Sequence, residues 1–529
     1  MKKFNTAGVC IPSKHYMADI SGTAQEIKKL ADDGKYFSIS RPGQYGKTTA
    51  LTALKLALAD QYDVISIDFQ DITSADFENE SEFTKGLARL LRDTRDSMEI
   101  PVPDARYDKF QELAGKAEEA NLNDIFRIFD RWCKENEKPV ALIIDEADTA
   151  ANHHVFWDFL GKLRSNYLKR EKNANYRTFQ SVILAGVTDV RQLKSRIRPE
   201  DEIKEYSPWN IAADFTVDMS LSKDGIKGML NEYEADHHTG MDTEAMARTI
   251  REYTSGYPFL ASRICQLVDE EVTKTMTPAE AWTDKGINEA VKLLLSENNT
   301  LFQSLTKNLN SYPELKTAIH SILMEGTKLT YNAQQSAIAM MQMYGLIRND
   351  HNTVRIANRI FETMLYNLFL SDEELKKNVF SREGELAKNI FIKDGRLNMR
   401  LIMEQFIKTY HEILGPLQKR FKEKDGREMF LLYLKPIING TGNYYIEAQT
   451  RDQTRTDVIV DYLGQQYIIE LKIWRGERYN AAGEKQVSDY LDYWHLKTGF
   501  MLSFNFNKNK ETGVKQVHIG DKLLYEGTV

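Results

Sequence analysis

The stretch "RPGQYGKTTALTAL", residues 41–54, matches the pattern G-x-x-x-x-G-K-[ST] except at its first position. Gly46, Lys47 and Thr48 fit the pattern, and Arg41 stands where the opening glycine is expected. "KYFSIS", residues 35–40, alternates apolar and polar residues as a strand does, and "TALTALKLALA", residues 49–59, repeats leucine and alanine at helical spacing. The sequence therefore predicts a glycine-containing loop between a strand and a helix.

A loop in this position has the chemistry of a phosphate site. Its backbone N–H groups and the helix N-terminus carry partial positive charge, which attracts an anion. Lys47 would reach the β- and γ-phosphates of ATP, and the Thr48 hydroxyl would hold Mg²⁺. Gly43 and Gly46 can take the positive φ angles that such a loop needs, and Arg41 and Pro42 would stiffen its entry. The predicted nucleotide-binding residues are Arg41, Pro42, Gly43, Gln44, Tyr45, Gly46, Lys47, Thr48 and Thr49. The alternative is an ordinary glycine turn before a helix.

A second stretch, "PVALIIDEADTA" at residues 139–150, supplies acidic groups after a continuous apolar run. Such a run suits a parallel strand buried on both faces, and ligands of α/β sheets bind at the carboxyl ends of the strands. Asp145 would hold Mg²⁺, and Glu146 would orient or deprotonate the attacking water. The alternative is an acidic turn in which Asp148 caps a helix. The two motifs together, in this order, predict an ATP and Mg²⁺ site.

Two further stretches supply candidates for the same site. "QSVILAGVTDV", residues 180–190, predicts a third strand that ends in Thr188 and Asp189, which would sense the γ-phosphate if they do not simply form a turn. Beyond it, Arg191, Arg196 and Arg198 are candidate arginine fingers, although a solvated basic loop is the better interpretation for any single one. In "SGYP", Pro258 begins a helix, which either lies against the nucleotide or is a plain joint between helices.

The C-terminal part has a second group of chemically suggestive residues in "TRTDVIVDYLGQQYIIELKIWRG", residues 454–476. Two strands joined at Gly464 are predicted, and residues two apart on a strand face the same way, so Glu470 and Lys472 project together. Asp457 and Glu470 would hold Mg²⁺, or Mn²⁺ in its place, while Lys472 would position the nucleophile and stabilise charge. The alternative is a solvated hairpin face. A helix follows, with Gln486 and Tyr490 four residues apart on one side.

Composition narrows the function classes. The chain has 529 residues and a net charge of −7, so no global positive field attracts nucleic acid, and any such binding must use local patches. Its three cysteines are far apart and match no metal or disulfide spacing, which fits a reducing cytoplasm. No apolar stretch of about 18 residues is present, so we expect no membrane span.

The predicted fold class is α/β, with a parallel P-loop sheet, a helical lid, a winged helix and a second α/β domain. Strand and helix patterns alternate up to about residue 210, and a β-hairpin around "NDHN" follows helices, as in a winged helix. The predicted divisions are 1–210 for the ATPase core, 211–294 for the lid, 295–372 for the winged helix, 373–390 for a linker or exposed helix, and 391–529 for the C-terminal domain.

The C-terminal part, from about residue 390, resembles the PD-(D/E)XK nuclease superfamily. Asp457 matches the aspartate of its second strand, and Glu470-x-Lys472 matches the motif of its third strand. Gln486-x-x-x-Tyr490 matches the extra motif of the RecB-like branch, and Glu428 matches its first-helix glutamate. Thr456 stands where that family often has proline.

The part up to about residue 370 resembles bacterial AAA-ATPase-like proteins that carry such a nuclease domain. Their loop typically reads R-P-R-x-[FY]-G-K-[ST], so Arg41 is usual for the family and Gly43 occupies its variable basic position. The "SGYP" region and the winged helix resemble the lid of STAND-type and archaeal ATPases.

The resemblance implies an ATP-binding and ATP-hydrolysing switch that controls a Mg²⁺-dependent nuclease. Nucleic acid, with DNA favoured, would be the substrate, and defence of a bacterial cytoplasm against foreign DNA is the role suggested by analogy. The alternative is a regulatory nucleotide-binding protein whose nuclease-like domain only binds nucleic acid or a protein partner. Homo-oligomer formation stays open.

Overall fold

The structure, a computed structural model, describes residues 2–97, 105–116, 118–173, 175–188, 208–325, 327–375, 379–414, 423–438, 442–449, 455–474, 477–505, 507 and 510–529. The chain divides into two compact units. The first contains Met1–Tyr233, Gly256–Ser262 and Met343–Gly345, and the second contains Glu234–Ser255, Arg263–Gln342 and Leu346–Val529. The finer divisions expected from the sequence stay predictions.

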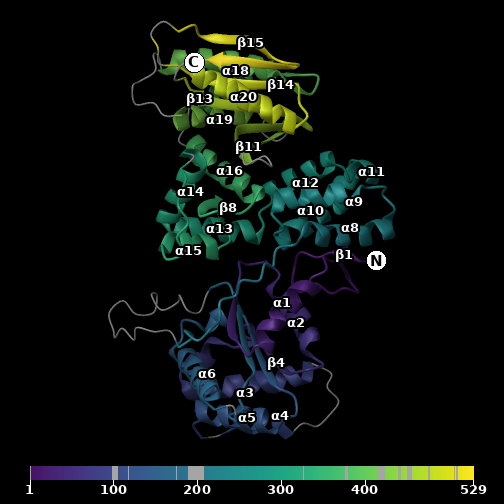
Figure 1. Ribbon diagram of the computed structural model, residues 1–529, viewed down its shortest axis with the longest axis vertical. Coiled ribbons are helices and arrows are strands. Elements are labelled where there is room, and N and C mark those ends of the chain that lie inside the picture. The colour runs from purple at the N-terminus through teal and green to yellow at the C-terminus, as the bar shows by residue number, and fades with distance from the viewer. Residues whose placement is uncertain are drawn as a thin grey trace. The chain divides into compact units, whose positions relative to one another are not determined.

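A four-stranded parallel sheet forms the centre of the first unit, as the α/β prediction requires (Figure 1). Its strands, in spatial order, are β3 (Tyr36–Ser40), β6 (Ser181–Gly186), β5 (Val140–Asp145) and β4 (Asp63–Asp68). The strand before the glycine loop and the strand before Asp145 are therefore not neighbours, because β6 lies between them. The carboxyl ends of these three parallel strands meet at one edge of the sheet.

Helices cover both faces of this sheet, and the alternation of the strands explains why. Ile143 and Ile183 pack with α1 (Ser21–Asp32) and α2 (Lys47–Leu58). Leu142 and Leu184 face the other way, into a core shared with four helices. Those helices are α3 (Glu80–Ser97), α4 (Ala105–Ala114), α5 (Leu122–Glu135) and α6 (His154–Lys172). Strands β5 and β6 are buried throughout, as their continuous apolar composition predicts.

Short elements complete the first unit. Strands β1 (Lys3–Phe4) and β2 (His15–Tyr16) pair in parallel, and the rings of Phe4 and Tyr16 pack on Tyr233 of α8 (Lys223–His237). The 3₁₀ turns are η1 (Phe69–Asp71), η2 (Ser74–Phe77) and η3 (Ala147–Ala150). Helix α10 (Pro258–Glu270) begins within this unit.

The second unit contains a helical part and a hairpin. Its helices are η5 (Val272–Lys274), α9 (Thr243–Thr254), α11 (Pro278–Ala281), α12 (Asp284–Ser296), α13 (Thr300–Ser311), α14 (Pro313–Glu325), α15 (Ser336–Met343) and α16 (Arg359–Leu375). Strands β7 (Ile347–Asp350) and β8 (Thr353–Ile356) form the hairpin expected at "NDHN". Its turn residues His351 and Asn352 both have positive φ, as a tight two-residue hairpin turn requires.

A six-stranded mixed sheet forms the C-terminal part of the second unit (Figure 1). In spatial order its strands are β11 (Gly442–Gln449), β12 (Arg455–Tyr462), β13 (Gln465–Ile473), β14 (Thr498–Phe504), β16 (Lys522–Thr528) and β15 (Gly513–Ile519). The two strands predicted around Gly464 are β12 and β13, and β11, β14, β15 and β16 complete the sheet. Leu463 and Gly464, both with positive φ, form the turn between β12 and β13.

Four helices accompany this sheet: α17 (Val379–Phe391), α18 (Met399–Leu414), α19 (Glu423–Ile438) and α20 (Glu477–Tyr493). The short strands β9 (Ile392–Lys393) and β10 (Arg396–Leu397) form a small hairpin. Much of the stretch expected to be a linker or exposed helix is thus the helix α17. Within the described residues, no helix is long and apolar enough to cross a membrane.

Candidate functional site

The glycine loop turns sharply into helix α2. Gly46 is the N-cap of this helix and adopts the left-handed conformation with φ 79°. Gln44 also has a positive φ, of 58°. Of the two glycines able to take a positive φ, Gly46 does so, and the other positive φ of the loop falls at Gln44 and not at Gly43. A residue other than glycine, such as Gln44, adopts this backbone conformation at a cost in free energy, so contacts with the surrounding residues must hold the loop in place.

Lys47 lies inside the loop. It is the first residue of α2 and is only 6% exposed. Its ammonium group donates to the carbonyl oxygens of Arg41 and Pro42, each at 3.3 Å. A buried ammonium surrounded by loop backbone concentrates positive charge where the helix N-terminus adds its own. The loop thus has the charge that a polyphosphate requires.

Thr48 and Asp145 meet at the carboxyl edge of the sheet. The Thr48 hydroxyl donates to Oδ2 of Asp145 at 2.9 Å, and the backbone N–H of Glu146 donates to Oδ1 of Asp145 at 3.0 Å. A hydroxyl and a carboxylate are oxygen ligands suited to Mg²⁺, which proteins usually bind through one or two carboxylates together with substrate phosphates. Among the described residues, no group of three His, Cys, Asp or Glu side chains could hold a metal alone. The pair therefore fits a Mg²⁺ ion that is shared with a nucleotide.

Glu146 follows β5 in the left-handed conformation, with φ 49° and ψ 37°. Burial raises the pKa of its carboxyl group; the positive charge of Lys47 opposes this shift, and the negative charges of Asp148, Asp145 and Asp68 reinforce it. A carboxylate whose pKa moves toward neutrality is a better general base than an ordinary surface glutamate.

Asp148 contacts the end of β6. Its Oδ2 accepts the backbone N–H groups of Val187 at 3.1 Å and Thr188 at 3.2 Å. Thr188 follows β6, the strand between β3 and β5. It therefore lies between the glycine loop, which follows β3, and the acidic residues Asp145 and Glu146 at the end of β5. Asp189, Arg191, Arg196 and Arg198 lie outside the described residues.

Arg41 has an unexpected set of partners. Its guanidinium donates to the carbonyl oxygens of Ser40 at 2.9 Å and Val217 at 2.7 Å, and it lies over the ring of Phe215 at 4.9 Å from the centroid. Burial lowers the pKa of this guanidinium. The residue that replaces the usual glycine thus ties the loop entry to a neighbouring segment through cation–π and carbonyl contacts.

The "SGYP" segment touches the loop as well. The Tyr257 hydroxyl donates to the carbonyl oxygen of Gly43 at 2.6 Å, and its ring packs edge-on against Tyr45. Pro258, the first residue of α10, lies beside Gly46, since a Cβ on that glycine would be in van der Waals contact with the proline ring at 3.8 Å. Of the two interpretations offered for this segment, its position favours the one in which it lies beside the nucleotide loop.

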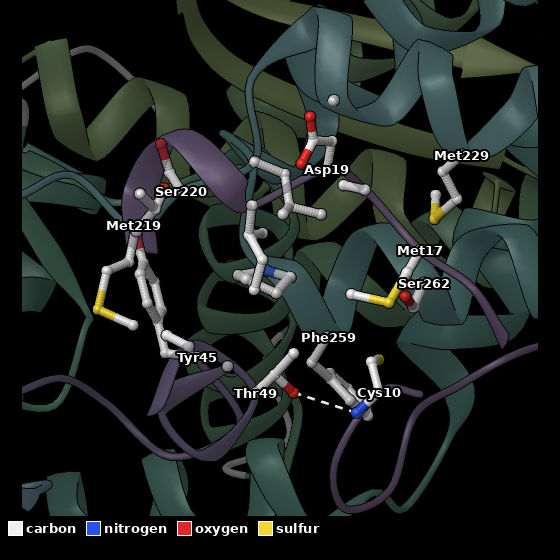
Figure 2. A pocket seen from close by; sticks show the side chains of 18 of the residues that line it. Cys10, Met17, Asp19, Tyr45, Thr49, Met219, Ser220, Met229, Phe259 and Ser262 are labelled. Carbon is white, nitrogen blue, oxygen red and sulfur yellow. Dashed lines mark hydrogen bonds between the residues drawn. The ribbon is translucent and has the colours of Figure 1, made fainter. Parts of the chain in front are cut away.

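A pocket of about 450 Å³ lies directly beside the loop (Figure 2). The backbone N–H of Cys10 donates to the Thr49 hydroxyl at 3.1 Å, which fastens the N-terminal segment to α2. The side chains of Met17 and Phe259 contribute apolar walls. Sequence reasoning missed most of the lining, because these residues form no motif and come from stretches that lie far apart in the chain. They include Asn5, Thr6, Gly8, Cys10, Met17, Asp19, Asp218, Met219, Ser220, Met229, Phe259 and Ser262.

The C-terminal candidates form a chain of contacts on one face of β13. Glu470, only 3% exposed, lies 3.3 Å from the ammonium of Lys472. Lys472 donates to Oε1 of Gln486 at 3.1 Å, and Nε2 of Gln486 donates to the Tyr490 hydroxyl at 2.8 Å. The i, i+2 and i, i+4 spacings read from the sequence thus bring these side chains together.

Two other C-terminal candidates, Asp457 and Glu428, lie on other elements of this unit. Asp457 belongs to β12, which pairs with β13, but its side chain lies outside the described residues. Glu428 lies on α19.

Gly483 of α20 packs so tightly on Lys472 that a Cβ there would lie 3.1 Å from Cδ of the lysine. Helix α20 therefore covers the lysine and limits where its ammonium group can reach.

Comparison with known proteins gives a family match for the N-terminal two thirds of the chain. The sequence profile of the family described as "AAA-like domain" matches residues 5–370. A comparison with curated protein sequences found no significant match.

Several solved structures resemble this one over most of their length. The Walker-type ATPase PABY2304 of Pyrococcus abyssi is 14% identical, with 69% of this chain and 99% of that chain covered and a TM-score of 0.47. The Aeropyrum pernix ORC2 protein is 12% identical, with coverages of 70% and 98% and a TM-score of 0.40. Cdc6p of Pyrobaculum aerophilum is 14% identical, with coverages of 70% and 97% and a TM-score of 0.33.

Proposed function

The chain belongs to the AAA-like domain family, and from that premise we propose that it is an ATP-hydrolysing switch that controls a metal-dependent nuclease. The observation that carries the first half is the 2.9 Å contact between the Thr48 hydroxyl and Asp145, beside the buried Lys47. These residues come from two motifs about a hundred positions apart in the chain, and they are the groups that an ATP and Mg²⁺ site requires.

ATP would bind with its phosphates in the loop and its base and sugar in the adjoining pocket. Lys47 and the N-terminus of α2 would neutralise the β- and γ-phosphates. The pocket, at about 450 Å³, lies within the usual size range of a small-molecule site, and its walls combine apolar side chains such as Met17 and Phe259 with polar ones such as Asn5 and Ser262. Bound Mg²⁺ would supply charge neutralisation at the phosphate oxygens, with Thr48 and Asp145 as its protein ligands.

Hydrolysis needs a base and an orienting group. Glu146 would take the proton of the attacking water, and its raised pKa suits that task. Thr188, at the end of the strand between the two motifs, would contact the γ-phosphate side of the site. Lys47 would stabilise the charge that develops on the transferred group.

The nuclease half of the proposal rests on the contacts among Glu470, Lys472 and Gln486. Asp457 and Glu470 would hold Mg²⁺ or Mn²⁺, which would polarise the phosphodiester. Lys472, held in place by Gln486, would stabilise the extra negative charge of the transition state. DNA is the substrate we favour, with defence against foreign DNA in a bacterial cytoplasm as the role.

Binding and hydrolysis of ATP by the wild type and by Lys47→Ala test the first half. We expect the variant to lose more than about tenfold in affinity for a fluorescent ATP analogue, equivalent to about 1.4 kcal/mol. Lys29→Ala, which removes an exposed lysine of α1, is the matched control. Equal affinity of wild type and Lys47→Ala would exclude the assignment of the loop.

Cleavage assays on single-stranded DNA, double-stranded DNA and RNA, with Mg²⁺ or Mn²⁺ and with or without ATP, test the second half. Lys472→Ala should retain metal binding and lose cleavage, because the lysine acts on transition-state charge. Asp457→Ala should weaken metal binding as well. Both variants should keep ATP hydrolysis. Equal cleavage by wild type and Lys472→Ala would reject this site, and no cleavage by the wild type under any condition would favour a domain that only binds nucleic acid or a protein.

A further inference from the structure

We propose that Asp148 is a positioning residue for ATP hydrolysis, which holds Thr188 in place relative to Glu146. The inference rests on the proposed function and deepens it. It begins from a contact between two segments that the sequence motifs treat separately, the turn after β5 and the end of β6. Asp148 belongs to η3, only two residues after Glu146.

The contact is specific in geometry. One carboxylate oxygen, Oδ2, accepts two consecutive backbone N–H groups, those of Val187 and Thr188, at 3.1 and 3.2 Å. Hydrogen bonds to an ionised acceptor are stronger than bonds between neutral groups. Because two adjacent peptide groups are held, both the position and the direction of the chain at Thr188 are defined.

The carboxylate of Asp148 has room beside the end of β6 only because residue 186 is a glycine. A Cβ on Gly186 would lie 2.3 Å from Oδ1 of Asp148 and 2.9 Å from its Cγ. Any larger side chain at position 186 would therefore push the carboxylate away from the two N–H groups. Gly186 has no positive φ, so the requirement for glycine here comes from space.

The cost of this arrangement argues for a role beyond packing. Among the described residues, no group donates a hydrogen bond to the buried Oδ1 of Asp148. A buried acceptor without a donor lowers stability, and such groups in folded proteins call for a functional explanation.

The order of the strands explains how this contact affects the site. Strand β6 lies between β3, which leads to Lys47, and β5, which leads to Glu146. A displacement of Thr188 would therefore change the geometry between the phosphate loop and the base. Misplacement of a catalytic group by about 1 Å can cost about 100-fold in rate.

Steady-state ATP hydrolysis and hydrogen exchange of the full chain test the proposal. Asp148→Ala should lower kcat by more than about tenfold while the affinity for a fluorescent ATP analogue changes less than about threefold. Asp148→Asn, whose side-chain oxygen accepts the same N–H groups, should restore most of the rate. Gly186→Ala should resemble Asp148→Ala, and Gly161→Ala, where a Cβ meets nothing within 4 Å, should behave as the wild type.

The double variant Asp148→Ala/Thr188→Ala separates positioning from a general loss of structure. It should be no slower than the slower single variant, because Asp148 acts through Thr188. Additive losses would overturn the proposal. Independently of activity, the amides of Val187 and Thr188 should exchange about tenfold faster in Asp148→Ala than in the wild type.

Unchanged exchange at these two amides would also overturn the proposal, whether or not the protein hydrolyses ATP. If the wild type bound ATP without hydrolysing it, the proposed function would fail in its hydrolytic part, and the exchange measurement would still decide the role of Asp148. The two failures are therefore distinguishable.

Discussion

The hydroxyl of Tyr257 lies 2.6 Å from the carbonyl oxygen of Gly43, although 214 positions separate the two residues in the chain. Tyr257 is buried, and its ring also packs against Tyr45 of the same loop. The "SGYP" turn is therefore part of the wall of the nucleotide loop. Because of these contacts, a change in the loop backbone on nucleotide binding would directly shift the start of α10.

Tyr257→Phe should weaken ATP binding by about two- to tenfold, because one hydrogen bond of about 0.5–1.5 kcal/mol holds the loop carbonyl. Titration with a fluorescent ATP analogue measures the loss. Tyr331→Phe, which removes another tyrosine hydroxyl with a side-chain partner, is the control. An affinity equal to that of the wild type would mean that the loop keeps its conformation without this bond.

Arg41→Gly restores the usual glycine of the motif and should nevertheless lower the local stability of β3 and the loop. The change removes the bonds to the carbonyl oxygens of Ser40 and Val217 and the contact with Phe215. We expect about tenfold faster hydrogen exchange in peptides that cover β3 and the loop. ATP affinity should change less than about threefold. A large loss of affinity with unchanged exchange would instead place the guanidinium on a phosphate.

Cys10 should report occupation of the pocket. Cys133 and Cys265 are buried, and burial raises the pKa of the Cys133 thiol to about 12, whereas Cys10 is only partly buried and lines the pocket. N-ethylmaleimide should therefore modify Cys10 first. Mg²⁺ and ATP should slow this modification in the wild type but not in Lys47→Ala, as measured by peptide mass spectrometry. Equal rates with and without ATP would place the nucleotide outside this pocket.

Glu146→Gln should keep the shape of the site and remove the base. ATP binding in the presence of Mg²⁺ should persist, and hydrolysis should slow by about 100-fold or more. Glu171→Gln, a change of an exposed glutamate on α6, should leave the rate unchanged. Normal turnover by Glu146→Gln would make Glu146 a structural residue.

Asp461 should stabilise the attachment of the C-terminal sheet to the helices of its unit. The residue is 1% exposed, and its carboxylate accepts hydrogen bonds from Asn288 of α12 at 2.9 Å and from the Gly464 backbone at 3.2 Å. Asp461→Ala leaves these donors without their acceptor, at a cost of about 1–3 kcal/mol. Peptides from the β12–β13 hairpin and from α12 should then exchange faster, while Asp521→Ala at the exposed Lys497 pair should change nothing.

Local patterns in the sequence predicted much of this fold. The strand, loop and helix around Lys47, the buried strand before Asp145 and the two hairpin turns all follow from the period and turn chemistry of adjacent residues. The same spacings predicted that Glu470 and Lys472 would share a face, and that Gln486 would lie near Tyr490. These predictions succeeded because each depends on residues only two to a few positions apart.

The order of the strands and the partners of the key side chains were decided only in the folded chain. Nothing local places β6 between β3 and β5, directs Arg41 to the carbonyl oxygen of Val217, or brings Cys10 to Thr49. These contacts join segments that are tens to hundreds of residues apart, and they form because the sheet buries both of its faces and the loops at its carboxyl edge must satisfy their backbone groups. Periodicity shows which faces are buried, whereas the packing of whole elements determines which residues meet.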